Sequence, residues 1–164
     1  MKVVPYNEQW TKIFQAEKEL ISSKLRGKII DIQHIGSTSI PQMSAKPIID
    51  IAVLIENHEN ADKFNRPLAQ IGYRFNSSST ERQYYIKGDP DKFHLSIAYA
   101  DRGGFWKRQI LFRDYLRQHH DLALEYEALK KRLIGKYPDG SQPYTNGKNE
   151  FVRKILMLAE KNKN

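Results

Sequence analysis

The run IIDIAVLIE at residues 48–56 constrains the fold most, because it is apolar apart from Asp50 and Glu56. A run this long that is rich in β-branched residues and follows Pro47 is typical of a buried strand. Alternate residues of a strand share one face. The expected core face consists of Ile49, Ile51, Val53 and Ile55. Asp50 then falls on the opposite face, where a carboxylate needs a cation, a hydrogen-bond donor or water.

The periodicity of the remaining chain predicts an α+β fold, a small mixed sheet flanked by helices and followed by a C-terminal helical segment. Helices are expected over residues 8–26, 58–71, 104–118, 120–136 and 148–161. Strands are expected over 29–35, 48–56, 73–76, 82–87 and 92–99. We also expect one helical turn over 40–44, capped by Ser39, and a break at QPYTNG before residue 148.

The composition favours one domain over residues 1–164, with the sheet core in 1–100 and the C-terminal helices in 103–164. The net charge of +8, from 27 basic and 19 acidic residues, favours an anionic partner such as a nucleotide, a nucleic acid or another phosphate compound. Since the chain has no cysteine, disulfides, thiolate nucleophiles and cysteine-ligated zinc are excluded. No segment approaches the ~18 apolar residues of a membrane span, so we expect a cytoplasmic protein with no membrane partner.

The segment GSTS at residues 36–39 predicts a phosphate site. Gly36 lets a ligand approach the backbone, and the amides and hydroxyls of Ser37, Thr38 and Ser39 at a helix N-terminus suit a phosphate. Mg²⁺ bridges phosphate oxygens and carboxylates, so a phosphate site shortly ahead of Asp50 indicates a nucleotide site with Mg²⁺ or Mn²⁺ at Asp50. The structural alternative is that Gly36 permits a tight turn, Ser39 caps a helix and Asp50 binds a neighbouring amide.

Three further side chains are candidates for the same site. His94 lies on the polar face of the strand FHLSIAY, as a metal ligand or base, or as a half-buried histidine bonded to a neighbour. Lys46 is positioned to reach a phosphate, or is a solvated loop lysine. Arg113 is positioned to clamp a phosphate, or pairs with an acidic neighbour. The basic cluster Lys130, Lys131, Arg132 and Lys136 is interpreted as a solvated helix face.

The segment Ile35-Gly36-Ser37 followed by Asp50-Ile51-Ala52-Val53 resembles the signature of the nucleotidyltransferase superfamily. That signature is hydrophobic-Gly-[Gly/Ser], about ten residues, then Asp-hydrophobic-[Asp/Glu]-hydrophobic. Ala52 stands where the signature has its second acid, and both acids normally bind the catalytic metals. This departure puts a standard two-metal site in doubt.

The chain is more closely similar to the GrpB-like family, a bacterial group within that superfamily that lacks a settled function. The resemblance rests on HIGSTSIPQMSAKPIIDI, FWKRQILFRDYLRQHHDLALEYEALKKRL, YTNGKNEFVRKIL and the N-terminal VVPYNEQW. It implies a nucleotidyltransferase-like fold, and it draws attention to Tyr144 and Lys148, with Lys148 as a further nucleotide-binding candidate.

Three functions remain open. The first is a transferase that binds a nucleoside triphosphate and a divalent metal, with in-line attack of an unknown acceptor hydroxyl on the α-phosphate and pyrophosphate as the leaving group. The second is a non-catalytic nucleotide- or phosphometabolite-binding protein on the same fold. The third is an RNA-binding module, supported by the positive charge and by aromatic residues but lacking a recognisable aromatic RNA-binding motif.

Overall fold

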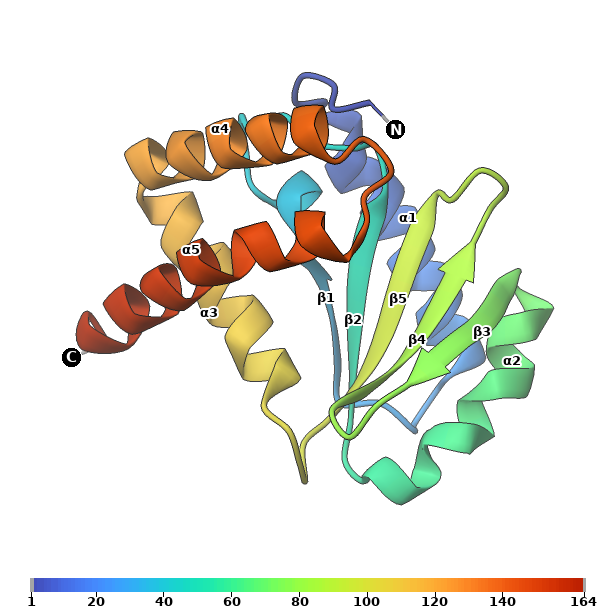
Figure 1. Ribbon diagram of the computed structural model, residues 1–164. Helices are drawn as coiled ribbons and strands as arrows, with labels where there is room; N and C mark the ends of the chain where they lie inside the picture. Colours follow the sequence, from blue (N-terminus) through green and yellow to red (C-terminus); the bar gives the residue numbers. More distant parts are fainter. Residues whose placement is uncertain (1, 164) are drawn as a thin grey trace.

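A computed structural model describes residues 2–163 and confirms the α+β fold (Figure 1). Its sheet has five strands in the order β1-β2-β5-β4-β3. The strands are β1 (Asp31–Ile35), β2 (Ile49–Ile55), β3 (Tyr73–Ser78), β4 (Arg82–Lys87) and β5 (Phe93–Tyr99). β2 runs parallel to β5 and the other pairs are antiparallel, so the sheet is mixed.

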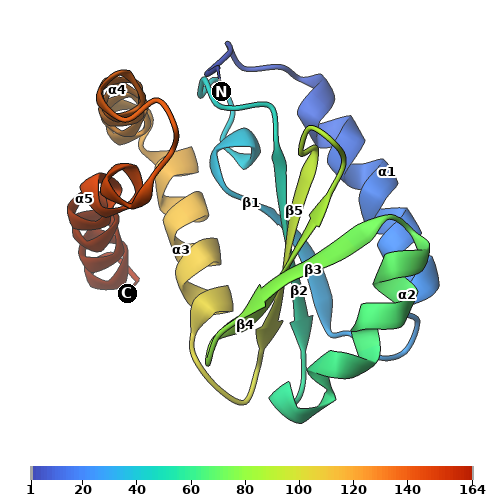
Figure 2. The same ribbon diagram turned by 45° about the vertical axis from the view of Figure 1, so that its right-hand side comes forward.

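Helices cover both faces of this sheet. They are α1 (Gln9–Lys24), α2 (Asn65–Gln70), α3 (Phe105–Gln118), α4 (His120–Lys136) and α5 (Gln142–Lys161), with 3₁₀ segments η1 (Ser37–Ser39) and η2 (His58–Phe64). Figure 2 shows α1 and α2 against one face, while α3, α4 and α5 form a separate layer on the other side. Among residues 2–163, no helix combines the length and the apolar character needed to cross a bilayer.

Two apolar clusters hold the layers together. The first lies between the sheet and α1 with α2, and it contains the predicted core face of β2, whose side chains are at most 2% exposed. The second joins α3, α4 and α5 to Ile40 and Met43, which lie in the loop that follows η1. Because that loop supplies side chains to the second cluster, the helical layer is packed directly against the segment that follows the turn at residues 36–39.

The structure differs from the predicted elements at three places. The helical turn spans Ser37–Ser39 rather than 40–44, since Gly36 turns the chain with a φ of 74° and the Ser39 hydroxyl donates back to the Gly36 carbonyl at 2.5 Å. Helix α5 begins at Gln142, because a proline in the first turn starts a helix rather than breaking it. The first half of the predicted 58–71 helix is the 3₁₀ segment η2.

Candidate functional site

The turn at residues 36–39 lies directly over the Asp50 carboxylate. The antiparallel register of β1 and β2 pairs Ile35 with Asp50, so Gly36 is the next residue above it. A Cβ added at Gly36 would collide with the carboxylate oxygen and lie 2.9 Å from Asp50 Cγ. The contact therefore requires glycine at this position for its missing side chain as well as for its positive φ. The Asp50 side chain is 38% exposed, which leaves it open to a ligand.

His94 joins Asp50 to a second carboxylate. The parallel pairing of β2 and β5 sets His94 beside Asp50, with His94 Nδ1 3.6 Å from Asp50 Oδ1 and His94 Nε2 2.9 Å from Asp91 Oδ2. Burial acts to lower the pKa of His94, but the hydrogen bonds and charges of Asp50 and Asp91 outweigh it and raise that pKa. The two carboxylates thus favour the protonated imidazole more than water does, and a protonated His94 would balance part of the negative charge of Asp50.

A cleft opens at this point and has two lobes that share Ser37, Asp50 and Lys148. The first lobe, of about 250 Å³, adds Lys46 and Lys130, and we call it the lysine lobe. The second, of about 340 Å³, lies among α3, α4 and α5, and we call it the helical lobe. Thr38 and His94 line the lysine lobe, and Gly36 lines the helical lobe.

Lys130 is a buried member of this site, so its interpretation as part of a solvated helix face is wrong. It is 5% exposed, and its ammonium donates to Ser37 Oγ at 2.6 Å and to the Ser44 carbonyl at 3.5 Å. Burial, with repulsion from Lys148, lowers the pKa of Lys130 to about 7. Helical spacing offered a signal, since Lys130 continues the buried stripe of Ala123 and Tyr126 on α4.

Lys46 and Lys148 converge on the same lobe around the ring of Tyr144. Their ammonium groups lie 4.6 and 4.7 Å from the ring centroid. Burial lowers the pKa of each, and for Lys148 the charge of Lys46 lowers it further. Tyr144 is 6% exposed and its hydroxyl has no hydrogen-bond partner among residues 2–163, although it lines the lobe. Three lysines thus meet around the one carboxylate that lines this lobe within the described residues, that of Asp50.

Arg113 lines neither lobe of the cleft. It is 8% exposed, and its guanidinium donates to the Gln33 side chain and to the His34 carbonyl, each at 2.9 Å, and contacts Asp114. These bonds tie α3 to β1. In this position the Arg113 guanidinium is engaged by the protein and does not reach either lobe, so it is not placed to clamp a phosphate there.

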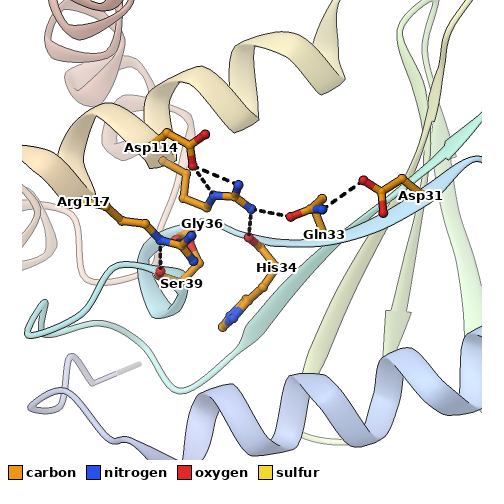
Figure 3. A network of polar contacts seen from close by, with 8 residues as sticks. Asp31, Gln33, His34, Gly36, Ser39, Asp114 and Arg117 are labelled. Atoms are coloured by element: carbon orange, nitrogen blue, oxygen red, sulfur yellow. Dashed lines mark hydrogen bonds and ion pairs between the residues drawn. The ribbon is translucent and has the colours of Figure 1, made fainter.

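Thr38 and Ser39 of the turn are also bonded to side chains that line neither lobe. Arg117 Nε donates to the Ser39 carbonyl at 2.9 Å (Figure 3), and His34 Nε2 lies 2.9 Å from Thr38 Oγ1. Burial, aided by the charges of Arg117 and Arg113, lowers the pKa of His34 to about 4, so His34 is neutral. The hydroxyls of Thr38 and Ser39 are engaged within the protein, which leaves Ser37 as the hydroxyl that faces both lobes.

The neighbours of Asp50 on the sheet supply no second acid. Ala52 is fully buried and pairs with Gln33 on one side and Ser96 on the other. Ser96 Oγ accepts a 2.7 Å hydrogen bond from Arg82, a cation that the sequence did not single out. Within residues 2–163, no group of three or more His, Asp or Glu side chains is arranged to hold a metal ion.

The sequence profile described as GrpB protein matches residues 1–157. A relative from Bacillus subtilis, "UPF0157 protein YqkA", is 37% identical over 155 residues, which are 93% of this chain but only 45% of that protein. The crystal structure of the conserved protein GrpB from Enterococcus faecalis shares 33% identity with a TM-score of 0.88, and 98% of each chain is covered.

More distant structures share the fold alone. The Cid1 poly(U) polymerase bound to MgATP is 12% identical with a TM-score of 0.56, covering 80% of this chain and 44% of that one. At this identity the likeness concerns the arrangement of strands and helices. It confirms that the fold is of the nucleotidyltransferase type.

Proposed function

Since this chain belongs to the GrpB family and has a nucleotidyltransferase-like fold, we propose that it binds a nucleoside triphosphate in the cleft under the Gly36–Ser37 turn. The phosphates occupy the lysine lobe, in contact with Lys46, Lys130, Lys148 and the Ser37 hydroxyl. The proposal concerns the residues of this chain, whereas the Bacillus subtilis relative is about twice as long.

The observation that carries this proposal is the buried ammonium of Lys130. Its polar partners are a hydroxyl, a carbonyl and a thioether, with no carboxylate among them. The nearby Glu127 carboxylate instead accepts the Ser44 amide. The charges of Glu127 and Asp50 offset only part of the effect of burial on this ammonium, since neither carboxylate bonds to it. A buried charge that is incompletely paired is costly, and an anionic ligand in the lobe would reduce that cost. Phosphate oxygens suit the site because each can accept several of the ammonium and hydroxyl donors.

A divalent metal fits this site only together with the phosphates. Asp50 supplies a carboxylate, but the charges of Lys46, Lys130, Lys148 and Arg82 all act on it, and Ala52 offers no ligand. Mg²⁺ is commonly held by one or two carboxylates plus substrate phosphates. Asp50 would therefore hold Mg²⁺ or Mn²⁺ whose remaining ligands are phosphate oxygens and water. Such an ion would neutralise charge on the phosphates and polarise the α-phosphate.

Two activities are compatible with this binding mode. In a transferase, an acceptor hydroxyl attacks the α-phosphorus in line, the bond to the bridging oxygen breaks, and pyrophosphate leaves with that electron pair. Asp50, with His94 beside it, is the group positioned to take the hydroxyl proton. The missing second acid favours the alternative, a nucleotide- or phosphometabolite-binding protein that performs no transfer. No particular contact favours the RNA-binding function.

Thermal denaturation with each of the four nucleoside triphosphates, with and without Mg²⁺ or Mn²⁺, tests the proposal. Ligand at a hundred times its dissociation constant should stabilise the protein by about 2.7 kcal/mol. Lys130→Met should abolish the shift. Lys131→Met should keep it, since that neighbouring lysine is 54% exposed. If no nucleotide raises the melting temperature with either metal, the binding proposal is wrong.

The role of Asp50 is tested separately with Asp50→Asn, which keeps the shape and removes the charge. We expect the protein to fold and to bind triphosphate, while the additional shift caused by Mg²⁺ or Mn²⁺ disappears. An unchanged metal dependence in this variant would remove Asp50 from the metal site. Release of pyrophosphate with a suitable acceptor would separate the transferase from the binding protein.

A further inference from the structure

The helical lobe is lined by a largely buried tyrosine whose hydroxyl has no hydrogen-bond partner among residues 2–163. Tyr126 on α4 is 7% exposed and lines this lobe, and its hydroxyl makes no hydrogen bond among residues 2–163. No fully enclosed side-chain nitrogen or oxygen in those residues lacks a partner. The Tyr126 hydroxyl therefore keeps some accessible surface, and the helical lobe is the cavity that this residue lines. A buried hydroxyl that opens onto a cavity is a ready hydrogen-bond partner for a ligand.

The ring of Tyr126 is fixed in position by its neighbours. It stacks on Phe151 of α5 at 5.2 Å and meets Phe112 of α3 edge-on at 5.3 Å, and the Lys130 ammonium lies 4.9 Å from its centroid. The Tyr126 ring thus packs against the aromatic side chains of the helical layer, and it also contacts Lys130, which lines the lysine lobe. A side chain held in this way presents its hydroxyl without a loss of rotamer freedom on binding.

The rest of the helical lobe is mostly uncharged. The amides of Gln109 and Asn149 line it without a hydrogen bond to another residue in the range 2–163, and Phe112, Val152 and Leu156 add apolar surface. Arg108 is paired with Glu81 at 2.6 Å. Free amides beside aromatic and aliphatic side chains are suited to a planar, uncharged group with donors and acceptors on its edge. The adjoining lysine lobe is cationic, so one molecule that fills both has a polyanionic tail and a neutral aromatic head.

We propose that the helical lobe binds the nucleoside part of the triphosphate, with the Tyr126 hydroxyl as its buried hydrogen-bond partner and the Gln109 and Asn149 amides at the edge of the base. This inference rests on the proposed function, since it assumes that the phosphates lie in the lysine lobe. Tyr126 is a binding residue that selects a nucleotide over a bare polyphosphate.

Equilibrium titration of the full chain with inorganic tripolyphosphate and with each nucleoside triphosphate tests this inference. At least one nucleotide should bind tenfold or more tightly than tripolyphosphate. Tyr126→Phe keeps the ring packing and removes the hydroxyl, so it should reduce that ratio by about three- to tenfold, the effect of one hydrogen bond. Affinity for tripolyphosphate should not change. Gln109→Leu should also reduce the ratio and should change the order of preference among the four bases.

Tyr137→Phe serves as the matched control, because Tyr137 ends α4 and lines neither lobe. If every nucleotide binds no more tightly than tripolyphosphate, or if Tyr126→Phe weakens both ligands equally, the nucleoside does not lie in the helical lobe. If neither ligand binds to the wild-type protein, the proposed function fails as well. Binding of tripolyphosphate alone would contradict the inference and leave the lysine lobe as a polyphosphate site.

Discussion

At the scale of single residues, the candidate site depends on a buried lysine, on a carboxylate within an apolar strand, and on a glycine that leaves room for that carboxylate. Lys130 keeps an amine in the protein interior, and Asp50 keeps a carboxylate in the middle of an apolar strand. Gly36 is the glycine, since a Cβ at this position would collide with the Asp50 side chain. Unfavourable groups of this kind are often retained where they have a function. A polyanion bound under the turn would give Lys130, Asp50 and Gly36 a common function.

Gly36→Ala should destabilise the protein by roughly 1–3 kcal/mol and weaken nucleotide binding, because the new methyl group adds a collision with Asp50 to the strain of a positive φ. Chemical denaturation gives the free energy of unfolding. Gly27→Ala is the matched control, since Gly27 has nearly the same φ, 73°, with no atom within 4 Å of an added Cβ. Equal losses in the two variants would show that contact with Asp50 is unimportant.

The lowered pKa of Lys130 makes the free energy of unfolding depend on pH. The unfolded chain has the ordinary lysine pKa of 10.5 and the folded protein has about 7. Between these values the unfolded chain binds more protons, so stability rises with pH, whereas below pH 7 the cost of the buried charge is fully present. Lys130→Met should therefore stabilise the protein most below pH 7, and the gain should shrink as the pH rises from 7 toward 10.5.

Affinity for tripolyphosphate should follow the charge of the same amine. Wild-type affinity should fall as the pH rises above 7, by up to about tenfold per pH unit while proton uptake accompanies binding. Lys130→Met should bind weakly with a flatter profile, which separates the lysine from the titration of the ligand itself. Parallel profiles for the two proteins would contradict the assignment.

At the scale of elements, the turn is held in place by the helix that packs behind it. Arg113 of α3 binds β1 at Gln33 and His34, and Arg117 of the same helix binds the Ser39 carbonyl (Figure 3). These contacts hold the Gly36–Ser39 segment through side chains that line neither lobe of the cleft. The pair of arginines is therefore expected to support the site without touching the phosphates.

Arg113→Met should cost about 2–4 kcal/mol of unfolding free energy, because it leaves buried acceptors on β1 without a donor. Where the variant is folded, its affinity for tripolyphosphate should remain within about threefold of the wild type, measured by titration below its melting temperature. Arg153→Met, on the exposed side of α5, is the control for loss of an arginine. A large loss of affinity with unchanged stability would indicate that Arg113 contacts the ligand after all.

Much of the element pattern follows from local sequence. Local sequence predicts β2, β4 and β5 to within a residue or two, and in β2 and β5 the alternate apolar residues of the core face are buried as expected. The Gly-Ser turn and the strand aspartate indicate where the candidate site lies, and the parallel register brings His94 to Asp50. The sequence does not predict the start of α5 correctly, because the proline and glycine of QPYTNG are typical of a break between helices. In the structure Pro143 lies in the first turn of α5, where proline is favourable.

The cations of the site were harder to predict. Lys130 is a buried lysine only because α4 packs over η1, and its partner Ser37 is far from it in sequence. The same tertiary packing turns Arg113 away from the cleft and brings Arg82 to Ser96. A charged residue on a helix is exposed by default. For Lys130 the spacing from Ala123 and Tyr126 is a sequence signal of burial, whereas the positions of Arg113 and Arg82 depend on contacts between elements that sequence periodicity does not describe.

At the scale of the whole molecule, the cleft lies where two separately packed halves meet. The sheet and the loop before β2 supply Asp50, His94 and Lys46, and the helical layer supplies Lys130 and Lys148. Figure 1 shows the two parts, the sheet with α1 and α2 and the layer of α3, α4 and α5. A ligand in the cleft would touch both halves, so its binding energy would add to the contacts that hold them together. The net charge of +8 would favour the approach of an anion.

A crystal structure of the protein with a non-hydrolysable nucleoside triphosphate and Mn²⁺, in which anomalous scattering locates phosphorus and manganese, tests the central claim most directly. We predict phosphate oxygens within hydrogen-bond distance of Lys130 Nζ and the Ser37 hydroxyl, with manganese on the Asp50 carboxylate. Phosphates bound instead to the exposed lysines of α4, such as Lys131 and Lys136, with an empty lysine lobe, would contradict the account.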